Sequence, residues 1–213
     1  MFNDQLSPAN KIILAATLLL ALFFALGLLL SCGGPGPLVY RNESYGFAVT
    51  YPKAYKIREF SFNGEQTGAE FNIDFGSITI RAMAAGTIYK DMKFDDYVLI
   101  AAASEIQNFQ EIASYRKFRS LSGVHGYETF WEVSETIPPD EWSEGLQPQK
   151  KIFGPIYYFP PRAPKLSGAQ PVKTIMLSYY AKSSGEAEIL VKKDLTEIAR
   201  SFRYLSTPDG SEQ

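Results

Sequence analysis

The sequence predicts a folded α+β domain that follows an N-terminal hydrophobic segment. Three observations lead to this expectation. Residues 12–30 carry no charge, several later segments alternate apolar and polar residues with the period of a β-strand, and two segments repeat apolar residues with the period of an α-helix. The 213 residues, of which 21% are charged and 14% aromatic, suit one domain plus an anchor rather than a disordered chain.

The N-terminal segment is expected to meet a membrane. The uncharged stretch from Ile12 to Leu30 is long enough to cross a bilayer as a helix. Leu29-Leu30-Ser31-Cys32 ends this stretch and resembles the lipobox of bacterial lipoproteins. The resemblance implies that residues 1–31 are a signal peptide and that Cys32 carries diacylglycerol, with no other Cys in the chain to compete. An uncleaved membrane helix and a plain secretory signal are the alternatives.

A lipid on Cys32 defines the expected location. Two or more acyl chains give stable attachment where one is marginal. We therefore expect the protein at a cell membrane or outer membrane, with its domain on the extracytoplasmic side. Residues 32–39, rich in Gly and Pro, form the expected tether to this domain. Residues 40–205 form the expected domain, and residues 206–213 a flexible tail.

The domain is expected to contain a sheet covered by helices. Alternation and turn signals place strands at residues 47–52, 55–62, 70–75, 77–84, 112–121, 126–136 and 172–181. Helices are expected at residues 94–107 and 186–202. The second helix carries an apolar stripe of Val191, Leu195, Ile198 and Phe202, which indicates a packing surface. Antiparallel strands with segregated helices are typical of an α+β fold.

Three pieces of the domain resemble PsbP-like domains. They are Tyr40-Arg41-Asn42-Glu43-Ser44-Tyr45-Gly46-Phe47-Ala48-Val49-Thr50-Tyr51-Pro52-Lys53, Gly123-Val124-His125-Gly126-Tyr127-Glu128 and Ile198-Ala199-Arg200-Ser201-Phe202-Arg203-Tyr204. The resemblance implies an α/β/α sandwich with a central antiparallel sheet. It also implies a role in binding and assembly, as in an extrinsic photosystem II subunit. The family has no shared catalytic motif, so no catalytic residue is carried over.

Composition excludes several kinds of site. A net charge of −2 provides no basic excess for nucleic acid. A single Cys excludes Cys-rich zinc and iron–sulfur sites. His125, the single His, is expected at a hairpin corner, where the sequence supplies neither a nucleophile nor an orienting carboxylate. The acidic clusters at residues 91–96 and 140–144 lack the spacing of an EF-hand. We therefore expect no catalytic residue, no metal and no cofactor.

The most individual segment is residues 136–170, which are rich in Pro and aromatic residues. A long insertion of this kind is often functional, and Tyr, Trp and Arg are favoured at interfaces. Its candidate partner-binding residues are Trp142, Tyr157, Tyr158, Phe159 and Arg162. The alternative is that Phe153 to Phe159 form a strand whose aromatic side chains pack on the core.

These observations favour a lipid-anchored envelope protein that acts as a binding or assembly module for a membrane or envelope partner. The alternatives are an envelope enzyme, for example a hydrolase, and a carrier of a small ligand. An enzyme is expected to show a concave pocket with shifted titratable groups. A binding module is expected to show a broad and shallow aromatic patch instead, and a carrier needs an internal cavity.

Overall fold

The computed structural model describes residues 36–62, 64–84, 91–101, 109–134, 150–162, 166–167 and 170–205. Contacts divide the chain into two compact units, Met1–Gly36 and Pro37–Gln213. The expected signal peptide and Cys32 lie outside the described residues. Among the helices that the structure describes, none combines the length and the apolar character needed to cross a membrane.

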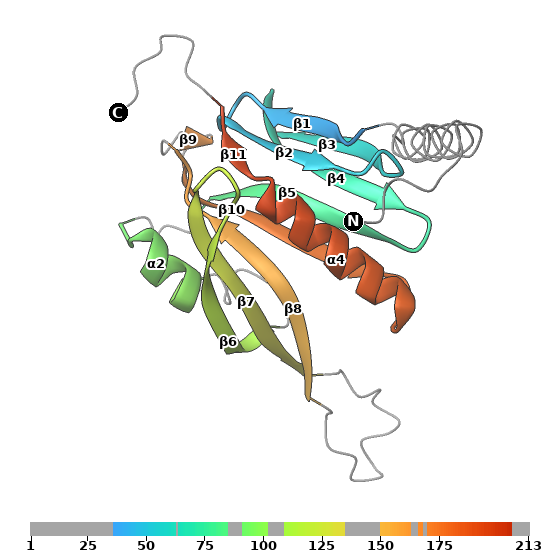
Figure 1. Ribbon diagram of the computed structural model, residues 1–213. Helices are drawn as coiled ribbons and strands as arrows, with labels where there is room; N and C mark the ends of the chain where they lie inside the picture. Colours follow the sequence, from blue (N-terminus) through green and yellow to red (C-terminus); the bar gives the residue numbers. More distant parts are fainter. Residues whose placement is uncertain are drawn as a thin grey trace, which may run out of the picture. The chain divides into compact units, whose positions relative to one another are not determined.

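The second unit is built mainly from antiparallel strands. Its eight-stranded sheet has the order β3 (Lys56–Phe62), β4 (Glu65–Ile73), β5 (Gly76–Ala84), β10 (Gln170–Ala181), β8 (Lys150–Phe159), β7 (His125–Ser134) and β6 (Phe109–Arg119), and β9 (Leu166–Ser167) pairs with β10 (Figure 1). A three-stranded sheet joins β1 (Leu38–Asn42), β2 (Phe47–Tyr51) and β11 (Arg203–Tyr204). Every described pairing is antiparallel.

Helices lie on both faces of the large sheet. Helix α4 (Glu186–Arg200) packs against β10, β5, β8 and β2, and α2 (Phe94–Asp96) continues into the π-helix η2 (Tyr97–Ala101). Successive side chains of a strand point to opposite faces. Along β8, Tyr157 lies in the same apolar cluster as Leu195 of α4, and Tyr158 lies in the cluster of Val98 of η2. The two helical segments therefore cover opposite faces of a mostly antiparallel sheet.

Most predicted elements are present, with changed ends. The apolar stripe of α4 is buried as expected. The predicted first helix is described only as far as Ala101 and turns from α to π after three residues. Strand β1 was not predicted, and it begins inside the expected tether. Its apolar residues Leu38 and Val39 are exposed while Asn42 is buried, so its sequence lacks the usual polarity pattern.

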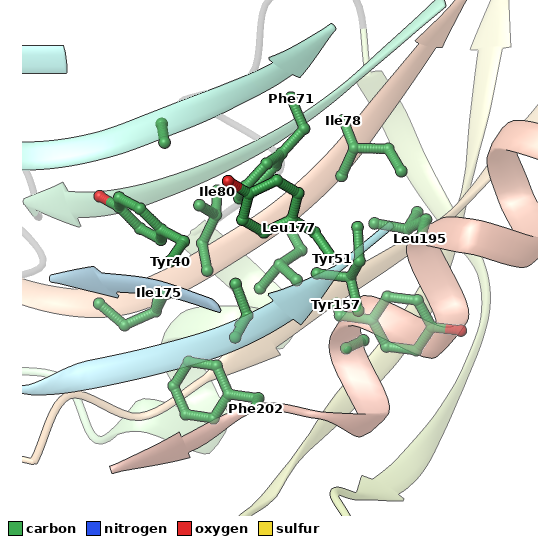
Figure 2. Close-up of a cluster of buried hydrophobic side chains, with 14 of the residues drawn as sticks. Tyr40, Tyr51, Phe71, Ile78, Ile80, Tyr157, Ile175, Leu177, Leu195 and Phe202 are labelled. Carbon is green, nitrogen blue, oxygen red and sulfur yellow. The ribbon is translucent and has the colours of Figure 1, made fainter. Parts of the chain in front are cut away.

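The main core lies between the large sheet, the small sheet and α4 (Figure 2). Its largest fully buried members come from both sheets and from the segment after α4: Phe47, Phe71, Tyr157, Phe159 and Phe202. The Phe202 ring stacks on the Phe159 ring with centroids 4.1 Å apart and planes at 1°. It also stacks on Phe47 at 5.6 Å. Phe202 lies two residues after the last residue of α4, so these stacked rings fix the end of the helix between the two sheets.

Candidate functional site

Residues 150–159 of the predicted aromatic insertion form the central strand β8. β8 pairs with β10 on one side and with β7 on the other. Tyr157, Tyr158 and Phe159 are buried, so the prediction that they contact a partner from an exposed loop is wrong. The alternative, a strand packed on the core, is confirmed. The reason is that both faces of β8 are covered, which lets aromatic residues occupy consecutive positions.

The other two predicted partner-binding residues, Trp142 and Arg162, lie outside the sequence range of β8. Arg162 is exposed, and its guanidinium donates a hydrogen bond to the backbone carbonyl of Leu205. Trp142 lies outside the described residues. The described part of the insertion therefore presents the cations Lys151 and Arg162 at the surface and no aromatic patch.

A buried polar cluster joins three elements beneath α4. The Tyr157 hydroxyl donates a hydrogen bond to Glu128 Oε1 at 2.7 Å and lies 2.9 Å from Thr196 Oγ1 of α4. Arg116 Nε of β6 donates to Glu128 Oε2. The Glu128 side chain is only 4% exposed, whereas that of Arg116 is 73% exposed. Burial raises the pKa of Tyr157, and the nearby Glu128 carboxylate raises it further.

Sequence reasoning missed this cluster. Glu128 alternates with Tyr127 and Thr129, which predicts a solvent-facing carboxylate on a half-buried strand. In the structure α4 covers that face, so a charged residue lies where a solvent contact is expected. The one signal that could have indicated this contact is the pairing of Glu128 with Arg116 across the hairpin of β6 and β7. The cluster links α4 to the sheet, because the Tyr157 hydroxyl contacts Thr196 of α4 as well as Glu128 of β7.

The face of β3, β4, β5 and β10 that points away from the main core forms a broad, open hollow. Its volume is about 990 Å³, and its charged and aromatic lining residues are Lys56, Arg58, Glu70, Asp74, Phe75, Tyr180 and Lys182. The alternate residues Phe71, Ile78 and Tyr179 point into the main core. Tyr180 is 62% exposed. This part of the sheet therefore has one apolar face and one face lined by exposed polar side chains.

The open face carries more positive than negative charge. Arg58 forms an ion pair with Glu70 at 2.6 Å. The guanidinium carbons of Arg58 and Arg81 each lie 5.6 Å from the centroid of the Phe60 ring, within the range of a cation–π interaction. Among the lining residues of the hollow, the cations Lys56, Arg58 and Lys182 outnumber the carboxylates Glu70 and Asp74 by one, and Arg81 adds a further cation beside Phe60. The excess is notable because the whole chain has a net charge of −2.

A second, smaller hollow lies where α2 meets the start of β7. Its volume is about 270 Å³, and its lining is Phe94, Asp95, Lys117, His125, Gly126, Tyr127 and Pro160. Lys117 of β6 is the cross-strand neighbour of Tyr127, and the Phe94 ring lies 6.0 Å from the Tyr127 ring. Burial raises the pKa of Tyr127, and the charge and hydrogen bond of Asp95 raise it further.

His125 occupies this second hollow. It is the first residue of β7, directly after the turn that joins β6 to β7, as the predicted hairpin corner requires. The sequence supplied no carboxylate for His125, and the fold brings Asp95 into the lining of the same hollow. Asp95 and Asp96 lie in the first turn of α2, whereas the acidic cluster at residues 140–144 lies outside the described residues. Within the described ranges, no three His, Cys, Asp or Glu residues are placed to hold a metal ion.

Comparison with known proteins gives a structural likeness only. No protein-family model and no curated protein matches the sequence. The solution structure of cyanobacterial PsbP (CyanoP) from Synechocystis sp. PCC 6803 is similar with a TM-score of 0.43 and 12% identity, over 81% of this chain and 96% of that one. A crystal structure from Bacteroides thetaiotaomicron VPI-5482 has a TM-score of 0.33 and 13% identity, over 81% of this chain and 50% of that one. The chain is thus structurally similar to cyanobacterial PsbP, and a likeness of this extent shows neither a family nor a function.

Proposed function

We propose that this chain is a bacterial lipoprotein with a PsbP-like domain, and that the domain binds an acidic segment of another envelope protein. The open basic face of β3, β4, β5 and β10 is the observation that supports binding. A surface of this kind attracts an oppositely charged partner over several ångströms and selects against a like-charged one. Its breadth and openness suit a protein segment better than a small substrate.

The anchor is supported by the sequence around Cys32. The lipobox-like Leu29-Leu30-Ser31-Cys32 follows the uncharged stretch directly. Residues 33–37 separate Cys32 from β1 and span at most about 20 Å when fully extended. A lipid on Cys32 would therefore keep the domain close to the bilayer. We infer that the partner is a membrane protein or another protein held at the same membrane.

The binding proposal is tested by site-specific cross-linking in native membranes. A photo-reactive phenylalanine replaces Tyr180 in the open face, and a matched control replaces Ile189, an exposed residue of α4. We expect an adduct at position 180 to one protein, whose cross-linked segment is rich in Asp and Glu by mass spectrometry. Adducts to lipid alone, to a segment without acidic residues, or equally from position 189 would contradict the proposal.

Charge reversal adds a second readout to the same experiment. Lys56→Glu together with Lys182→Glu is expected to reduce the adduct at position 180 at least tenfold, because both cations line the hollow. Lys193→Glu, at an exposed position of α4, is the matched control and is expected to leave the adduct unchanged. An adduct that survives the double reversal would show that charge does not select the partner.

The anchor is tested separately. Cys32→Ser is expected to abolish incorporation of a labelled fatty acid and to leave the N-terminal segment uncleaved. The measurements are labelling of growing cells and mass spectrometry of the membrane fraction. Equal labelling of the variant, or an intact N-terminus at Met1 in the unmodified protein, would overturn the lipoprotein assignment while leaving the binding proposal in place.

A further inference from the structure

We propose that the small hollow between α2 and the start of β7 binds a zwitterion, a free α-amino acid with an apolar side chain. Four separate parts of the chain meet there: α2, β6, β7 and the residue that follows β8. They bring cationic, anionic and apolar side chains around one space. This site shares no residue with the open basic face, so it is independent of the proposed protein partner.

The cationic side suits the carboxylate of the ligand. Lys117 and His125 lie on adjacent strands, and Lys117 is paired with Tyr127 while His125 is paired with Arg119. Residues two apart on a strand share a face, so Lys117 and His125 point to the same side of the sheet. The Lys ammonium donates up to three hydrogen bonds and the imidazole donates from a ring nitrogen. Both side chains are exposed, so a small anion can reach them from solvent.

The anionic side suits the ammonium group of the ligand. Asp95 lines the same hollow and is exposed. Its carboxylate receives the hydrogen bond of Tyr127, a buried residue beneath the hollow. A carboxylate has two oxygens with about four acceptor positions, so one hydrogen bond from Tyr127 leaves capacity for an ammonium donor. The negative charge of Asp96 acts on Tyr127 as well and adds to the negative potential at this end.

The apolar lining and the size limit the rest of the ligand. Phe94 and Pro160 line the hollow beside the charged groups and offer contacts to an aliphatic side chain. The volume of about 270 Å³ is below the range of about 300–1,000 Å³ that is usual for drug-sized ligands. A molecule the size of one amino acid meets this limit, and the opposite charges at its α-carbon match the opposite charges of the site.

The experiment compares three ligands of nearly equal shape. The full chain in detergent is titrated with L-leucine, with 4-methylpentanoate, which lacks the ammonium group, and with 3-methylbutan-1-amine, which lacks the carboxylate. Calorimetry gives affinity, and the imidazole signals of the single His125 report binding by NMR. We expect saturable binding of L-leucine and at least tenfold weaker binding of both analogues. Equal binding of either analogue, or no saturable binding of L-leucine, would overturn the proposal.

Matched variants locate the binding. Asp95→Asn and Lys117→Met are each expected to weaken L-leucine binding at least tenfold. Lys193→Met on α4 is the control and is expected to stay within twofold, because Lys193 does not line the hollow. Circular dichroism checks that each variant is folded. If both lining variants bind L-leucine like the unmodified protein, the ligand binds elsewhere and the assignment fails.

Discussion

Replacing Tyr157 by Phe tests whether the buried polar cluster holds α4 to the sheet. The ring stays in place, so its packing against Phe118, with centroids 4.7 Å apart, is kept and no cavity forms. The hydroxyl that donates to Glu128 at 2.7 Å is lost. A hydrogen bond to a charged group is worth about 1.5–3 kcal/mol, and Glu128 Oε1 then stays buried without that donor. Thr196 keeps its own bond to the Lys192 carbonyl at 2.9 Å. We expect a loss of about 2–3 kcal/mol in the free energy of unfolding.

Tyr179→Phe is the matched control for this substitution. The Tyr179 hydroxyl also donates to a carboxylate, Glu188 Oε1 at 3.0 Å, on the same side of the sheet. The Glu188 side chain is 29% exposed and is also paired with Lys192, so water and the ammonium can replace the lost donor. The Tyr179 hydroxyl also lies 3.3 Å from the Gly154 carbonyl oxygen. We expect a loss of about 1 kcal/mol, which is the usual net contribution of one intramolecular hydrogen bond.

Urea unfolding, followed by fluorescence of the buried Trp131, measures both variants. The slope of the free energy against urea should stay the same, because neither substitution changes the surface exposed on unfolding. A loss below about 0.5 kcal/mol for Tyr157→Phe, or a loss no larger than that of Tyr179→Phe, would show that burial of the Glu128 carboxylate does not set the energy of this contact.

Three further predictions address the core and its tyrosines. Phe202→Ala removes the stacked ring between the sheets and is expected to cost about 3–5 kcal/mol in urea unfolding; a loss under about 2 kcal/mol would contradict its central position. Gly126→Ala would place a Cβ against the Tyr158 carbonyl oxygen and the Phe159 ring, so the variant should melt well below the unmodified protein, and an equal melting temperature would refute the close strand contact. Burial raises the pKa of Tyr204 to about 12, and other buried tyrosines shift in the same direction. Below about pH 10 these groups are protonated in both states, whereas above it they ionise first in the unfolded chain, so stability should fall as the pH rises from about 10 towards 12. Circular dichroism and tyrosinate absorbance test this, and a flat stability over that range would refute it.

Local sequence patterns were sufficient for the elements whose two sides differ in polarity. Along β10, Ile175, Leu177 and Tyr179 alternate with more polar neighbours, and the structure buries all three in the main core. The apolar stripe of α4 could be predicted equally well, because residues at helical spacing lie on one face of a helix independently of the rest of the fold. In these segments the period of the backbone fixes which side chains point inward, so no knowledge of the partner element is needed.

The site residues depended on contacts between distant segments. Tyr157, Tyr158 and Phe159 are consecutive aromatic residues, which fit an exposed insertion or a strand covered on both faces equally well. Only the pairing of β8 between β10 and β7, with a helical segment on each face, decides between these.

The sequence by itself determined the uncharged N-terminal stretch with Cys32 at its end, the succession of strands and the inward face of α4. The tertiary structure decided that Glu128 is buried, and that Asp95 and Lys117 face one hollow. The physical reason is that periodicity acts within a segment, whereas burial and the grouping of charges depend on which segment covers which face, and long-range packing sets that choice.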